Sequence, residues 1–142
     1  LRHCAAPRLL TPHPGELERL FPCEGRSRRS WAEEFVQAYP TTLLLKGARS
    51  LVAERNAAPS FNTTGNPGMG SGGMGDALTG VCAALIGSGR SPREAALLGA
   101  WICGRAAEIA VFNGGESQES LSASSVIGNI GGAFRSLRNG DY

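Results

Sequence analysis

The strongest constraint on the fold of this chain is a glycine-rich loop, residues 62–75, that continues directly into an apolar segment with helical spacing. Six of its 14 residues are glycine. Glycine adopts positive φ without strain, so such a backbone can turn several N–H groups toward one point. At a helix start these N–H groups lack carbonyl partners and lie at the positive end of the helix dipole. The loop therefore predicts an anion-binding cradle, and the usual anion is a phosphate.

Two other interpretations of the loop compete with this one. A flexible linker is also rich in glycine, but a linker does not run straight into an apolar helix. The loop also lacks the lysine of a P-loop and the spacing of a dinucleotide fingerprint. Asp76 stands at its end, where a carboxylate either caps the helix, worth about 1 kcal/mol, or takes the proton of an attacking group. Beside a phosphate cradle we favour the second role.

The composition fits one globular domain of 142 residues with an ordinary apolar fraction, 42%. A formal charge of +2 is too small to indicate a nucleic-acid or membrane partner. We identify no apolar run long enough to span a bilayer and no cleavable leader. The four cysteines match no zinc or redox spacing, so we expect free, partly buried thiols in a reducing cytoplasm; they are Cys4, Cys23, Cys82 and Cys103.

The apolar pattern alternates short strands with helices, which is typical of an α/β layer architecture. We expect strands at residues 8–11, 42–45 and 50–53, and helices at 16–21, 31–39, 76–87, 92–112 and 122–138. Ser30 with Glu33, and Ser91 with Glu94, fit helix-start patterns. Residues 12–16 are expected to be a rigid turn between two prolines, and 54–61 to be irregular.

Three other polar residues are candidates for a site. Lys46 follows a strand, in a tight turn over 46–49, where it would neutralise a phosphate or lie on a solvated hairpin. In an α/β fold, ligands sit at the carboxyl ends of strands, so this turn and the glycine-rich loop are expected to meet. For His13, between two prolines, the residues alone favour a structural role. Glu16 is equally well explained as a first-turn charge of a helix. Trp31 and Trp101 are expected in the core.

Three segments, taken together, closely resemble one family. They are Thr11-Pro12-His13-Pro14-Gly15-Glu16, then Leu44-Leu45-Lys46-Gly47, then Thr64-Gly65-Asn66-Pro67-Gly68-Met69 continuing into Gly72-Gly73-Met74-Gly75-Asp76. The first and third are specific to the ADP- or ATP-dependent NAD(P)H-hydrate dehydratases, and the second is general to the ribokinase-like superfamily. The resemblance implies an α/β, ribokinase-like three-layer fold. Family domains are longer, so residues 1–142 would be only the C-terminal portion of one, without its N-terminal half.

The resemblance also implies a reaction. These enzymes dehydrate the S-epimer of NAD(P)H hydrate by activating the ring hydroxyl with a phosphoryl group from ADP or ATP and then eliminating phosphate. Asp76 would take the hydroxyl proton, and the N–H groups around Gly73, Met74 and Gly75 would hold the developing charge. His13 and Asp76 would contact the hydrated dinucleotide, and Mg²⁺ would act through the nucleotide phosphates, with no metal ligands in the chain itself. The adenine nucleotide would contact Lys46, Gly47, Ala48, Arg49, Ser50, Asn66, Pro67, Gly68, Met69, Gly72, Gly73, Met74 and Gly75.

Two departures and two rival functions accompany this expectation. Ser50 stands where the family often has threonine, and Ser125 lies near a position that is commonly acidic. One rival is a nucleotide-binding remnant with no activity of its own. The other is a small-molecule kinase of the same superfamily, which has no reason to carry the His13 turn. We expect NAD(P)H hydrate, an adenine nucleotide and further copies of the chain as partners, but neither nucleic acid nor a membrane.

Overall fold

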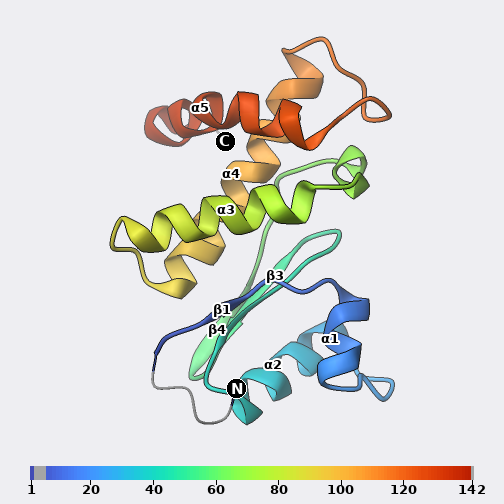
Figure 1. Ribbon diagram of the computed structural model, residues 1–142, viewed down its shortest axis with the longest axis vertical. Coiled ribbons are helices and arrows are strands. Elements are labelled where there is room, and N and C mark those ends of the chain that lie inside the picture. Colours follow the sequence, from blue (N-terminus) through green and yellow to red (C-terminus); the bar gives the residue numbers. More distant parts are fainter. Residues whose placement is uncertain (2–5, 142) are drawn as a thin grey trace.

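The computed structural model describes residue 1 and residues 6–141, so the cysteine at position 4 lies outside the described residues. A four-stranded sheet lies between two layers of helices, which confirms the predicted three-layer α/β architecture (Figure 1). The elements are β1 (Leu9–Leu10), α1 (Pro14–Leu20), α2 (Arg28–Ala38), β2 (Thr42–Leu45), β3 (Leu51–Glu54), β4 (Ala57–Phe61), the 3-10 helix η1 (Pro67–Gly70), α3 (Met74–Gly87), α4 (Pro92–Phe112) and α5 (Ala123–Asn139).

The strands follow the order β1-β2-β3-β4, with β1 parallel to β2 and the other pairs antiparallel. Strand β4 occupies the segment that we expected to be irregular, so that prediction is wrong. Its sequence, Ala-Ala-Pro-Ser-Phe, has little intrinsic strand preference, and it forms because β3 offers it a pairing partner. Pro59 cannot donate to a ladder, which suits the edge position of β4.

Both faces of β2 and β3 are buried over most of their length, which explains the apolar runs Leu43–Leu45 and Leu51–Ala53. Leu43 and Leu45 pack with Phe35 in the cluster on the α1–α2 side. Leu44 and its antiparallel partner Val52 belong to the cluster on the opposite face, with α3, α4 and α5. The core is therefore divided by the sheet, and Figure 1 shows the two helical layers on its two sides.

Helices α1, α2 and α3 each begin two or three residues earlier than the sequence predicted. Pro14 is the first residue of α1 and His13 is its N-cap, so the expected rigid turn over 12–16 is a helix start. Proline is tolerated there because the first helical N–H has no partner in any case. Helix α2 is capped by Ser27, whose hydroxyl accepts a hydrogen bond from the backbone N–H of Ser30. Ser30 itself is therefore inside the first turn.

Helix α4 is the central helix, and it begins with the predicted Ser91–Glu94 capping box. Small residues let its neighbours approach: a Cβ on Gly99 would lie 2.6 Å from the sulfur of Cys82 in α3. By length and hydropathy, 1.5 on average, α4 qualifies as a helix that could cross a membrane, so the expectation of no such run is wrong on these criteria. However, 56% of that stretch is buried inside the protein, and core helices pass the same test.

Candidate functional site

A cavity of about 700 Å³ opens between the β2–β3 turn, the glycine-rich loop and the first turn of α3. It brings together most residues that the sequence predicted for a nucleotide and its substrate: His13, Lys46, Gly47, Ala48, Arg49, Ser50, Asn66, Pro67, Met69, Met74 and Gly75. Four of the predicted residues do not line it, namely Gly68, Gly72, Gly73 and Asp76. The expected meeting of the Lys46 turn with the glycine-rich loop therefore takes place in this cavity.

Hydrogen bonds join residues 62–66, the first part of the glycine-rich loop, to α4. Each of four consecutive polar contacts joins the loop to that helix: Asn62 Nδ2 to the Ala100 carbonyl (3.2 Å), Thr64 Oγ1 to the Trp101 carbonyl (3.0 Å), Gly65 N to Glu108 Oε1 (2.8 Å) and Asn66 Nδ2 to the Ala107 carbonyl (3.2 Å). The approach depends on Gly104, because a Cβ there would lie 2.2 Å from Thr64 Oγ1. The loop is thus a fixed wall of the cavity.

Arg28 supports the turn that carries Lys46. Its Nη1 donates to the carbonyl of Ala48 at 2.8 Å, and its Nη2 donates to the carbonyls of Leu45 and Lys46 at 3.3 and 3.4 Å. Gly47 (φ +143°) and Arg49 (φ +55°) both adopt the left-handed region in this turn. Arg28 was not identified from the sequence, where it is one of several arginines in an arginine-rich segment. Only its position at the start of α2 distinguishes it.

Lys46 projects toward the first turn of α3. A Cβ on Gly75 would lie 3.0 Å from Lys46 Nζ, so the ammonium is packed against that turn. The first-turn N–H groups and the dipole of α3 add further positive potential at the same place. An ammonium and a helix N-terminus directed at one cavity are a suitable environment for an anion.

His13 and Glu16 form a capping box at the start of α1. The backbone N–H of His13 donates to Glu16 Oε2 (2.7 Å), and the N–H of Glu16 donates to His13 Nδ1 (3.2 Å). Glu16 Oε2 also lies 3.4 Å from Lys46 Nζ. The pKa of Glu16 is lowered, chiefly by the His13 backbone hydrogen bond and further by the charge of Lys46. His13 therefore has the structural role that its sequence context favoured, while its exposed ring lines the cavity.

Asp76 is the third residue of α3, and it is exposed. The N-cap is Gly73 (φ +84°), so the capping interpretation of Asp76 is wrong. With the residues that the structure describes, its carboxylate forms no hydrogen bond or ion pair. Thr79, one turn later on the same face, donates to the Gly75 carbonyl (2.9 Å) and lies 3.1 Å from Thr11 Oγ1. That contact turns the Asp76 face of α3 toward the segment that leads to His13.

Among the described residues, neither a metal cluster nor a reactive thiol contributes to the cavity. No group of three or more His, Cys, Asp or Glu that could hold a metal occurs within residues 1 and 6–141. The described cysteines are free, as predicted. Burial raises the pKa of Cys82 to about 11 and that of Cys103, which lines the cavity, to about 12. Cys103 is therefore a protonated, apolar part of the wall at neutral pH.

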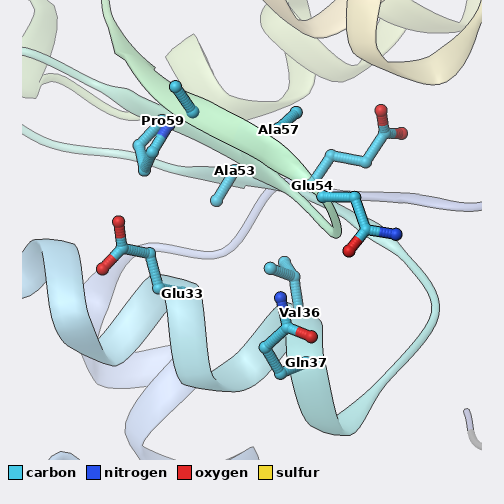
Figure 2. Close-up of a pocket in the computed structure, with 9 residues that line it drawn as sticks. Glu33, Val36, Gln37, Ala53, Glu54, Ala57 and Pro59 are labelled. Atoms are coloured by element: carbon cyan, nitrogen blue, oxygen red, sulfur yellow. The ribbon is translucent and has the colours of Figure 1, made fainter.

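A second cavity, of about 350 Å³, lies between α2 and the β3–β4 hairpin (Figure 2). Its wall includes the carboxylates Glu33 and Glu54 but neither lysine nor arginine. None of the residues predicted for the site lies there. Its charge makes it unsuitable for a phosphate, so the larger cavity is the candidate site.

Comparison with known proteins agrees with the motifs. A sequence profile of the family described as NAD(P)H-hydrate dehydratase matches residues 2–129. Among curated relatives, the bifunctional NAD(P)H-hydrate repair enzyme Nnr of Moorella thermoacetica is 38% identical over 135 residues, covering 92% of this chain and 25% of that protein. The ADP-dependent (S)-NAD(P)H-hydrate dehydratase of Neisseria meningitidis serogroup B is 35% identical over 135 residues, covering 92% and 44%.

Solved structures show the same relationship. Bacillus subtilis YxkO superposes with a TM-score of 0.85 at 27% identity, over 95% of this chain and 51% of that one. The ADP/ATP-dependent NAD(P)H-hydrate dehydratase from Bacillus subtilis, co-crystallized with ATP/Mg²⁺, gives a TM-score of 0.81 at 28% identity, over 91% and 47%. The chain thus spans about half the length, or less, of these proteins.

Proposed function

Since the chain belongs to the NAD(P)H-hydrate dehydratase family, we propose that residues 1–142 are the C-terminal portion of such a domain and carry its adenine-nucleotide subsite. The reaction is the ADP- or ATP-dependent dehydration of the S-epimer of NAD(P)H hydrate to NAD(P)H, a lyase reaction that repairs the nicotinamide nucleotide. The observation that carries the proposal is the Lys46 ammonium packed against Gly75, at the N-terminus of α3, inside the larger cavity.

The cavity suits an adenine nucleotide. Its volume, about 700 Å³, is within the usual range of small-molecule pockets. Lys46 and the first-turn N–H groups of α3 lie where phosphates need positive potential. An apolar wall for the adenine ring is provided by Met69, Leu78 and Cys103. Mg²⁺ would be held by the nucleotide phosphates, because it commonly takes few protein ligands and no metal cluster occurs among the described residues.

In this proposal Asp76 is the general base. Its exposed carboxylate has no partner among the described residues, so it is available to take the proton of the substrate hydroxyl. The bound nucleotide supplies the phosphoryl group that turns this hydroxyl into a leaving group. The N–H groups of Met74 and Gly75 stabilise the charge that develops on the transferred group. His13, on the side toward which the Asp76 face is turned, contacts the dinucleotide.

A second candidate is a nucleotide-binding remnant that does not turn over on its own. It is favoured by the position of Asp76, which does not line the cavity that would hold the nucleotide. In this alternative the nucleotide subsite is complete, while the dinucleotide subsite needs residues that the chain does not supply. A kinase of the same superfamily has no comparable observation in its favour.

A repair assay with matched aspartate variants tests the proposal. Hydrated NADH is incubated with the chain, Mg²⁺ and ADP or ATP, and recovery of NADH absorbance is followed. Asp76→Asn should lower the rate by roughly 10² to 10⁴-fold, the usual contribution of a general base, without weakening ADP binding. Asp141→Asn, at the only other aspartate, should leave the rate unchanged. ADP binding without recovery would select the remnant, and equal rates in both variants would refute the role of Asp76.

We also propose a cytoplasmic location and self-association. The free thiols at Cys23, Cys82 and Cys103 are suited to a reducing compartment. Large apolar side chains at Phe112 and Ile127, which are 73% and 55% exposed, support contacts between copies. Sedimentation analysis of the chain tests the second point, and a monomer at all concentrations would contradict it.

A further inference from the structure

The ammonium of Lys46 occupies an electrostatically unfavourable position. It is packed against Gly75 in the first turn of α3, where the helix dipole presents its positive end. The lysine stem is long and flexible, with several rotatable bonds, yet its side chain is only 25% exposed. A negative group close to the ammonium would offset this positive potential.

Glu16 supplies that negative group. Its Oε2 lies 3.4 Å from Lys46 Nζ, which is the ion pair that the structure gives Lys46 among its described residues. The same oxygen accepts the backbone N–H of His13 at 2.7 Å, so the capping box of α1 fixes the carboxylate in space. Asp76, although it belongs to the first turn of α3, makes no ion pair within the described chain.

We propose that Glu16 is a positioning residue that holds the Lys46 ammonium at the N-terminus of α3, ready for the phosphates of the nucleotide. That the ligand is a nucleotide phosphate rests on the proposed function, whereas the contacts of Glu16 with Lys46 and His13 do not. The alternative is that Glu16 only caps α1. A cap accounts for the contact with the His13 N–H, but it gives no reason for the second contact of the same oxygen with Lys46.

Glu16→Gln separates the two roles. Glutamine serves at the third position of a capping box as glutamate does, so α1 keeps its cap while the partner charge of Lys46 is lost. The chain offers a matched control, because Glu94 holds the same position in the capping box of α4. Among residues 1 and 6–141, its carboxylate accepts hydrogen bonds from Ser91 alone. Glu94→Gln changes the same chemical group away from the cavity.

The first readout needs no nucleotide. Lys46 is the only lysine in the chain, so its acylation by a limiting amine reagent is followed by peptide mass spectrometry, with the N-terminal amine as internal reference. Glu16→Gln should raise the Lys46 rate by about twofold to fivefold, the range expected for losing a partly exposed ion pair. Glu94→Gln should not change it. Equal Lys46 rates in the unmodified chain and in Glu16→Gln would overturn the proposal.

The second readout is ADP affinity by calorimetry. Glu16→Gln should weaken binding by about twofold to fivefold. In a Lys46→Met background the same substitution should have no weakening effect, because Glu16 acts through Lys46. Tighter binding in Glu16→Gln would overturn the proposal, since Glu16 would then merely repel the phosphates. If the unmodified chain binds no ADP, the proposed nucleotide function fails, and the acylation rates still decide the role of Glu16.

Discussion

Gly104→Ala tests the attachment of the glycine-rich loop to α4. A Cβ at this position would lie 2.2 Å from Thr64 Oγ1 and 2.7 Å from Thr64 C, so the loop has to move by roughly 1 Å to restore an ordinary contact. Such overpacking costs about 1–3 kcal/mol. Displacing Thr64 also removes its hydrogen bond to the Trp101 carbonyl, worth about 1 kcal/mol. Alanine returns about 1 kcal/mol through its helix propensity.

The net expectation is a loss of about 1–3 kcal/mol in the free energy of unfolding of Gly104→Ala. Gly128→Ala is the matched control, since Gly128 lies in α5 and a Cβ added there would meet no described atom within 4 Å beyond its chain neighbours and the surrounding helix backbone. It should gain up to about 1 kcal/mol. Urea unfolding measures both variants, and ADP affinity should fall only in Gly104→Ala. Equal stability of the two variants would refute the close approach of Thr64 to α4.

Two further predictions concern the wall of the cavity. Arg28→Met should raise the dissociation constant for ADP by roughly tenfold, because the turn over 46–49 loses its hydrogen bonds from the guanidinium. Arg29→Met should not, since among the described residues Arg29 forms an ion pair with the half-exposed Glu33 and none with this turn. Calorimetry compares the two variants, and equal effects would contradict the role of Arg28. Burial raises the pKa of Cys82 to about 11 and that of Cys103 to about 12, so both thiols should resist alkylation of the native protein at pH 8, while Cys23 reacts. Peptide mapping identifies the alkylated cysteines, and rapid labelling of Cys103 would contradict the prediction.

Local patterns predicted the elements whose signals lie within a few residues. Ser91 and Glu94 satisfy each other across a single turn, so the sequence alone locates the start of α4. The buried strand at 42–45 is recognisable because both of its faces are apolar. Strand β4 could not be predicted in this way, since its backbone hydrogen bonds come from β3 and its own side chains carry little preference for a strand.

In the candidate site, too, the residues marked by local motifs were predictable and those that act through distant contacts were not. Motif order indicated His13, Lys46 and the glycine-rich loop, and the structure brings them to one cavity. The residues that fix this arrangement were not predictable, because each acts across a long sequence separation. Arg28 supports a turn 18 to 20 residues away, and Gly104 matters only because Thr64 approaches it.

The attachment of the glycine-rich loop to α4 also has a kinetic consequence. Four side-chain and backbone contacts, all made by the chain's own groups, hold residues 62–66 on the helix. The shape of this wall is therefore set when the chain folds, and an arriving nucleotide does not have to order it. The association rate of the nucleotide should then be set by diffusion and by the charge at the entrance of the cavity, and not by a slow closing step. It should therefore depend strongly on ionic strength.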